Sequence, residues 1–363
     1  MGEAGAVTAR SRGPKGEEMT SGFNSNKGLS AALLVVTLFA AASLYAQTAP
    51  NGAQSPHAAT PLPATDEPAK KAIKDHAEYD AYASAVKIND PAQRAAALEQ
   101  FAQLFPRSVA VGQALTEALA AWQQAGKPDQ VVDTAKRLLV VQPANIRAMA
   151  IVVALDRARA AQQDRVDAGM MNEICEFSNS GLNQLPIWQM PAGMSAEQFS
   201  AMRNSMTLIF NAGAGTCALG QNDLAKARET LARAVAIDST DLQSLWQLSV
   251  ADLESRPVDA NGFWYCARAI AIAQRGQNQP AADTAINYCN KKYTAYHGSP
   301  DGWSPIMVAA QSQDALPADF TKFITPSANP NSMTTPTEPV QNLLPQPAAP
   351  APTQPENTTP TQQ

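Results

Sequence analysis

Hydrophobic positions in the middle of the chain recur every three or four residues, which is the spacing of one face of an α-helix. Between about 73 and 296, Ala, Leu, Gln and Arg dominate, and no alternation of apolar and polar residues extends beyond a few positions. The pattern therefore predicts an all-α domain. Its helices are expected at about 73–87, 91–105, 113–125, 130–141, 242–254, 262–274 and 280–296.

Two stretches, 112–145 and 208–241, each contain a helix, a short break and a second helix. In the second stretch, Gly215 and Ala227 are small residues that let the two helices approach closely, and Asp223 suits the start of the second helix. The segment 146–207 is irregular and carries an insertion at about 180–207, where Ser195 is expected to cap a helix. In the first stretch, the residues that set the helix faces and the breaks are Leu115, Ala118, Leu119, Trp122, Gly126, Leu138 and Pro143.

These spacings resemble those of tetratricopeptide repeat proteins, in particular exported bacterial members with degenerate repeats. The resemblance covers about 76–275 and implies a right-handed α-solenoid of helix hairpins. Such a hairpin cannot bury its apolar face alone and stacks on its neighbours, which creates a concave surface. The family implies a non-enzymatic scaffold that binds a protein or peptide there. The alternative is a closed helical bundle with a structural or an unrecognised enzymatic role.

The resemblance also implies which side chains face the concave surface. Trp188, in the Pro-rich insertion, would be a contact anchor if it were exposed, although a ring that folds back onto the helices is the favoured interpretation. The glutamines of the surface are equally typical of solvated helix faces without a partner. The expected surface residues are Gln113, Thr116, Glu117, Gln123 and Gln124 in one unit, and Gln243, Trp246 and Gln247 in another.

The two ends of the chain differ from the middle in composition. Residues 1–46 form a leader whose apolar stretch 29–46 has the layout of a signal peptide cleaved at Ala46-Gln47, with a single membrane anchor as the alternative and Met19 as a second candidate start. We therefore expect export to the periplasm or cell envelope, or a membrane-anchored domain outside the cytoplasm. Residues 47–72 are expected to be a disordered linker, 73–303 the helical domain, and 317–363 a disordered tail rich in Pro, Thr and Gln.

Charge and titratable residues argue against several classes of function. A net charge of -5 gives no basic footprint, so nucleic acid is not expected as a partner. His57, His76 and His297 lie in a linker and at opposite ends of the domain, and no nucleotide-binding or catalytic motif accompanies them. We therefore predict no enzymatic activity, no cofactor and no metal.

The chain has four cysteines and no Cys-x₂-Cys motif, so a zinc site is not indicated. Export permits disulfides, and four cysteines allow three connectivities. Cys266 and Cys289 lie equally far from the expected turn near 277–278, so an antiparallel hairpin places them side by side. We predict this bridge and expect Cys175 and Cys217 to be small buried core residues.

Overall fold

The computed structural model describes residues 73–163 and 166–328, and within these ranges the chain forms twelve α-helices, two short 3-10 helices and no strands. The all-α prediction is confirmed. The expectations for the leader, for the linker and for the tail beyond residue 328 lie outside the described residues. The α-helices are α3 (His76–Val86), α4 (Pro91–Leu104), α5 (Val111–Gln124), α6 (Pro128–Val141), α7 (Ile146–Ala160), α8 (Ala168–Gln184), α9 (Ala196–Gly220), α10 (Leu224–Ile237), α11 (Leu242–Glu254), α12 (Asn261–Arg275), α13 (Gln279–His297) and α14 (Trp303–Ser312); the 3-10 helices are η1 (Leu185–Ile187) and η2 (Phe320–Lys322).

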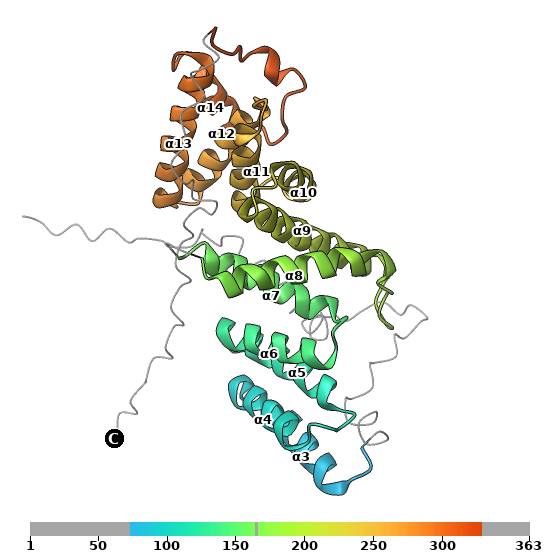
Figure 1. The fold of residues 1–363 in the computed structure, drawn as a ribbon. Helices are drawn as coiled ribbons and strands as arrows, with labels where there is room; N and C mark the ends of the chain where they lie inside the picture. Colours follow the sequence, from blue (N-terminus) through green and yellow to red (C-terminus); the bar gives the residue numbers. More distant parts are fainter. Residues whose placement is uncertain (1–72, 164–165, 329–363) are drawn as a thin grey trace, which may run out of the picture.

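The helices stack in the order of the sequence (Figure 1). Each helix from α3 to α12 packs against the next one in sequence, and α14 packs against α12. In the middle of the stack, α9 also contacts α7 and α11, so alternate helices meet there as well. Sequential pairing with contacts between alternate helices is consistent with a helical-repeat protein.

The helix starts follow from short polar side chains that precede them. In eight of the twelve helices, an Asp, Asn or Ser accepts a hydrogen bond from a backbone amide of the first turn, which satisfies a donor that the helix itself leaves open. The predicted caps Ser195 and Asp223 are both present, and Ser195 forms a reciprocal capping box with Gln198. Breaks between helices are therefore encoded locally.

Small residues set the distance between α9 and α10. A Cβ atom added to Gly215 would lie 2.4 Å from Cγ of Leu231, so a larger residue at this position would push the two helices apart. Ala227, on the facing side of α10, is fully buried. The close approach predicted for the unit 208–241 is thus present.

The apolar core consists of three consecutive clusters along the stack. The first is formed by α3 to α5, the second mainly by α5 to α9, and the third runs from α9 to η2. Trp122 packs against both the first and the second cluster. The core is therefore elongated along the stack, as expected when each hairpin buries its apolar face on its neighbours.

Two boundaries differ from the predictions. The helix expected to start at Ser195 and the first helix of the unit 208–241 are one continuous helix of 25 residues, α9. The packed domain also extends beyond residue 303, because α14 follows and the side chains of Phe320 and Ile324 are buried. A tail that begins at residue 317 was therefore placed too early.

The C-terminal part of the domain is held by a buried arginine and by aromatic contacts. Arg268 of α12 is fully buried and donates hydrogen bonds to the carbonyl oxygen of Ala310 (2.8 Å) and to Oδ1 of Asp314 (2.6 Å). The ring of Phe320 lies 5.6 Å from that of Trp264, measured between ring centroids. Segment 313–324 therefore covers α12 and closes this end of the stack.

Candidate functional site

The predicted surface residues of α5 lie in accessible positions. Gln113, Thr116 and Gln124 are exposed, and Glu117 and Gln123 are half-buried. Glu117 joins this row to the neighbouring alternate helix, because its Oε1 accepts hydrogen bonds from Gln113 Nε2 (2.7 Å) and from the hydroxyl of Tyr82 in α3 (2.8 Å). The result is a row of amides and one carboxylate along α5. Its role in binding a partner stays a prediction.

The α11 part of the predicted surface is placed differently. Gln243, Trp246 and Gln247 are all buried, and Trp246 packs edge-on against the ring of Tyr288 in α13 at 5.0 Å. The structure therefore does not present these three side chains to solvent, which corrects the expectation for them. The reason is that α11 is packed by α9, α10 and α12 at once, so nearly every one of its faces is covered.

The same region contains a polar junction between three alternate helices. Nε of Arg157 in α7 donates a hydrogen bond of 3.1 Å to Oγ1 of Thr216 in α9, and that hydroxyl donates one of 2.9 Å to Oε1 of Gln247 in α11. Asp241 precedes α11, and its Oδ2 lies 3.9 Å from Nη1 of Arg157. We name Arg157, Thr216, Asp241 and Gln247 the α7–α9–α11 junction.

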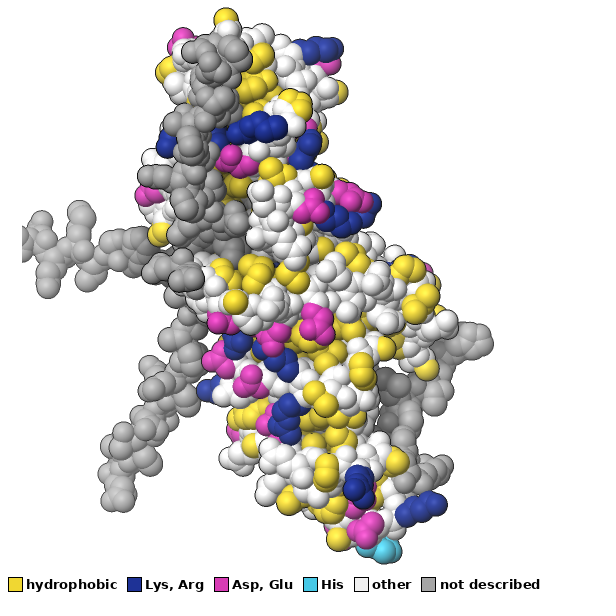
Figure 2. Space-filling view, viewed as in Figure 1, with side chains coloured by type: hydrophobic (Ala, Val, Ile, Leu, Met, Phe, Trp, Pro, Cys, Tyr) yellow, Lys and Arg dark blue, Asp and Glu magenta, His cyan; other side chains and the backbone are white. Residues whose placement is uncertain are grey.

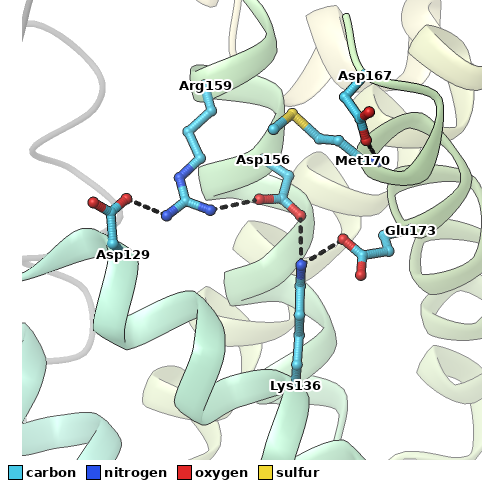
Figure 3. Close-up of polar contacts among 7 residues, drawn as sticks. All are labelled: Asp129, Lys136, Asp156, Arg159, Asp167, Met170 and Glu173. Carbon is cyan, nitrogen blue, oxygen red and sulfur yellow. Dashed lines mark hydrogen bonds and ion pairs between the residues drawn. The ribbon is translucent and has the colours of Figure 1, made fainter.

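A buried carboxylate between two cations ties α6, α7 and α8 together (Figure 3). Asp156 is 1% exposed; its Oδ1 accepts a hydrogen bond from Arg159 (3.2 Å), and its Oδ2 lies 3.8 Å from Nζ of Lys136. Lys136 also pairs with Glu173 of α8 at 2.5 Å, and Arg159 pairs with Asp129 of α6. Burial raises the pKa of Asp156, while the charges of Lys136 and Arg159 act to lower it. Every charged side chain of this cluster is thus paired with one of opposite charge. This favours a role in holding α6, α7 and α8 together over a role in catalysis.

The face drawn in Figure 2 likewise carries both positively and negatively charged side chains. Among the described residues on this face, acidic and basic side chains lie interspersed and form no large patch of one sign. Charges of both signs at close range are typical of ion pairs between neighbouring helices rather than of a nucleic-acid surface.

A second buried carboxylate lies where α10 meets α11 and the loop that leads to α12. Asp252 is 3% exposed and accepts a hydrogen bond of 2.6 Å from Nε of Arg228, whose other end pairs with Asp259. Burial raises the pKa of Asp252 to about 7, Arg228 opposes the rise, and the charge of Asp259 adds to it. This carboxyl therefore exchanges its proton near neutral pH.

Both pairs of cysteines are bonded in the structure. Cys266 and Cys289 join α12 to α13 with a Cα–Cα separation of 6.0 Å, which is the bridge that the hairpin geometry predicts. Cys175 and Cys217 join α8 to α9 at 5.2 Å, so the expectation that these two are separate core thiols is wrong. Two disulfides indicate an oxidising, extracytoplasmic location. In residues 73–163 and 166–328, no helix has the length and apolarity needed to span a bilayer.

The remaining candidate residues lie apart from one another. Trp188 is half-buried, and its ring lies 5.0 Å from that of Phe199, so it folds back onto the helices as favoured. His76 starts α3, and His297 ends α13, where its Nδ1 lies 2.9 Å from the carbonyl oxygen of Thr325; His57 lies outside the described residues. In the part of the protein that the structure describes, no three metal-ligating side chains are grouped to hold an ion.

Comparisons with known proteins do not assign the chain to a family. No family model matches the sequence, and neither a curated protein nor a solved structure is significantly similar to it. The residues and their geometry therefore carry the functional argument.

Proposed function

We propose that this protein is a non-enzymatic scaffold of the cell envelope, built as a right-handed tetratricopeptide-like solenoid that binds a protein or peptide. The binding face is the side formed by the alternate helices α3, α5, α7, α9, α11 and α13, which we name the alternate-helix face.

One observation carries the proposal: an accessible row of amides on α5 lies beside polar links that join α3, α5 and, further along the stack, α7, α9, α11 and α13. Polar side chains join α4, α6 and α8 as well, where Thr134 bonds to Glu99 and Lys136 pairs with Glu173, so the accessible row on α5 is what distinguishes this face. Tyr82 of α3 bonds to Glu117 of α5, the α7–α9–α11 junction joins the next three, and the hydroxyl of Tyr288 in α13 donates a hydrogen bond of 2.9 Å to Glu254 of α11. In a solenoid, alternate helices that lie side by side share one face on which an extended partner binds. The accessible part of that face carries Gln113, Thr116 and Gln124 of α5, because α11 is covered by α9, α10 and α12. The apolar side chains, in contrast, pack mainly on neighbours in sequence.

Two further observations support the repeat. The spacing of Gly215 and Ala227 matches the small-residue positions at which the two helices of a tetratricopeptide hairpin meet, and Gly215 indeed lies against Leu231. The end of α9 followed by α10 in the unit 208–241 repeats the order helix, short break, helix that α5 and α6 form in the unit 112–145.

The proposed location rests on composition and on the bridges. Two disulfides fit an oxidising compartment, and the apolar stretch 29–46 is typical of a signal peptide or an anchor. A partner would accordingly be a protein or peptide of the periplasm or envelope.

Site-specific photocrosslinking tests the binding face. A photoreactive amino acid replaces Gln113 or Gln124 on α5, and matched probes replace Asp133 and Val140, which are exposed on α6. With the protein expressed together with its own leader, we expect the α5 probes to give one discrete crosslinked product that contains the same partner, and the α6 probes to give none. Equal products from both helices, or none from α5, would refute the proposed face.

A further inference from the structure

The connection between α8 and α9 exposes large apolar side chains. We name residues 185–195 the α8–α9 loop; it contains η1 and lies at the edge of the stack (Figure 1). Ile187 is 67% exposed and Met190 is 50% exposed, and Pro186 and Ala192 beside them are exposed as well. Hydrophobic side chains gather at this edge in the space-filling view (Figure 2). Within the described part of the chain, these four side chains are open to contacts from outside.

The α8–α9 loop is held in place at both of its ends. Leu185 is 6% exposed and belongs to the second apolar cluster, and the ring of Trp188 lies 5.0 Å from that of Phe199 in α9. The other end is closed by the capping box that Ser195 and Gln198 form at the start of α9. The tip between these anchors therefore has a defined shape, and its apolar side chains stay outside instead of folding back onto the helices.

The α8–α9 loop is also uncharged. No charged residue lies between Glu176 of α8 and Glu197 of α9, whereas most of the other exposed large apolar side chains have a charge within a few residues, as Ile237 has in Asp238. A convex tip of this kind would need a matching cavity on a protein, because protein interfaces depend on complementary shape. The acyl chains of a lipid bilayer adapt to such a tip, and its lack of charge makes insertion favourable.

Side chains suited to the headgroup layer of a bilayer lie next to the tip and further from it. Trp188 is half-buried beside the tip, and tryptophan is enriched at membrane–water interfaces. Arg203 is exposed on α9, and Arg147 of α7 reaches the same helix, where its Nη2 lies 3.3 Å from Sδ of Met202. Glu197 is the acidic side chain on this part of α9. Since these charges are few and of both signs, apolar contact is the main force that the loop offers.

The chain that precedes Ile73 keeps a membrane within reach of the domain. The apolar stretch 29–46 is typical of a signal peptide or of an anchor, and both belong to a protein that meets a membrane. In an anchored form, residues 47–72 would span at most about 90 Å when fully extended. The α8–α9 loop would therefore meet the bilayer surface repeatedly in the proposed location.

We propose that the α8–α9 loop inserts Ile187 and Met190 into the outer layer of a phospholipid bilayer, with Trp188 at the level of the headgroups. The inference goes beyond the proposed function, because it concerns a lipid and a surface other than the amide row of α5. It uses the proposed location of the protein and not its proposed partner.

Depth-dependent fluorescence quenching tests the insertion in the full chain. An environment-sensitive fluorescent amino acid replaces Gln189 in the loop, and a matched probe replaces Gln124, an exposed glutamine of α5. The vesicles consist of phosphatidylcholine, with or without phosphatidylglycerol, and contain lipids that carry a nitroxide on the acyl chain. We expect quenching of the probe at 189 and none at 124. A chain that is held only through 29–46 would leave both probes unquenched, and this result, or equal quenching of both, would overturn the proposal.

Substitutions at the tip test whether its apolar side chains drive the insertion. With the probe at 189, Ile187→Ser combined with Met190→Ser should lower the ratio of inserted to free loop at least about tenfold, whereas Ile187→Leu with Met190→Leu should retain it. Added salt should leave the quenching unchanged. The side chains at both positions are exposed, so the midpoint of urea unfolding should match that of wild type in both variants. Quenching that survives in the serine variant, or that is lost in both variants, would overturn the proposal.

A protein that binds the loop is the competing outcome. A photoreactive amino acid in place of Gln189, in cells that express the full chain, should give crosslinks to lipid. A discrete protein product at 189 together with no quenching in vesicles would overturn the lipid contact and assign the loop to a protein interface. The proposed function fails separately, because the crosslinks from Gln113 and Gln124 test the amide row of α5 whether or not the loop inserts.

Discussion

Replacing Asp252 with asparagine is expected to change how the stability of the domain depends on pH. In the folded protein, burial raises the pKa of this carboxyl to about 7, and the charge of Asp259 adds to the effect. The hydrogen bond of 2.6 Å from Arg228 acts in the opposite direction but does not outweigh burial. The phenol of Tyr265 in α12 also faces this set, and its pKa is itself raised by burial and by the two carboxylates.

The size of the effect follows from the difference between the folded and the ordinary pKa. The ordinary value is 3.8, so the rise to about 7 spans about three units, and at about 1.4 kcal/mol per unit it corresponds to at most about 4 kcal/mol. The folded pKa lies above the unfolded one, so protonation favours the folded state. This stabilising contribution is complete below about pH 4 and is lost as the pH rises through about 7.

Asp252→Asn removes this titration and leaves the shape of the side chain nearly unchanged. As the pH rises from 5 to 8, the free energy of unfolding of the variant should increase by about 2–3 kcal/mol relative to that of wild type. The reason is that the carboxyl of unfolded wild type is already ionised in this range, whereas the folded protein holds its proton until about pH 7. Urea unfolding at several pH values, followed by tryptophan fluorescence, measures this difference, since Trp246 and Trp264 belong to the same apolar cluster. Asp133→Asn, at an exposed position of α6, is the control. Parallel pH curves for wild type and Asp252→Asn would refute the reasoning.

Three other substitutions or treatments test the packing. Gly215→Ala is expected to lower the free energy of unfolding by about 1–3 kcal/mol, because the added Cβ would lie 2.4 Å from Cγ of Leu231. An unchanged midpoint of urea unfolding would contradict the close approach of α9 to α10. Ser195→Ala removes the capping box and should cost about 1 kcal/mol, with faster amide exchange in the first turn of α9; exchange as slow as in wild type would show that the cap does not hold this end. Under limiting reductant, the α8–α9 disulfide should be reduced before the α12–α13 disulfide, because Cys175 is half-buried whereas Cys266 and Cys289 are fully buried. Alkylation of the released thiols followed by mass spectrometry measures this order, and simultaneous reduction of the two disulfides would contradict it.

Helix boundaries were the most predictable part of the fold, and particular residues explain why. The expected helix 242–254 coincides with α11, since Asp241 caps its start and Ser255, Arg256 and Pro257 follow its end. The helix expected at 91–105 ends one residue early, before Pro106. Caps and prolines act on their immediate neighbours, so a single sequence contains the whole signal.

Contacts between helices were less predictable. The bridge between Cys266 and Cys289 could be foreseen because both helices and their turn were visible in the pattern. The bridge between Cys175 and Cys217 was missed because the extent of α8, which starts at Ala168, was not resolved within the irregular segment 146–207. Pairing of two residues across a hairpin can be derived only when both of its helices are placed.

The candidate site shows the same limit. The positions of Gln113 and Thr116 on an open face of α5 followed from helix periodicity, but the burial of Trp246 and Gln247 did not. Periodicity tells which residues share a helix face and not how many neighbours cover that face. In the middle of the stack, α11 contacts helices on three sides, so polar side chains that would suit a solvated face become part of a buried junction.

The sequence nevertheless contained one signal of the C-terminal contacts that were not predicted. Helix α12 is apolar around most of its circumference, with Phe263, Trp264, Ile270 and Ala273 all buried, and a helix of that kind requires cover on more than one side. A domain that ended at residue 303 would have supplied only α11 and α13. Arg268, in the middle of this apolar helix, then needed an acceptor from a further segment, because a buried guanidinium without one is strongly destabilising. The fold meets both needs at once: α14 and segment 313–324 cover α12, and Asp314 supplies the carboxylate.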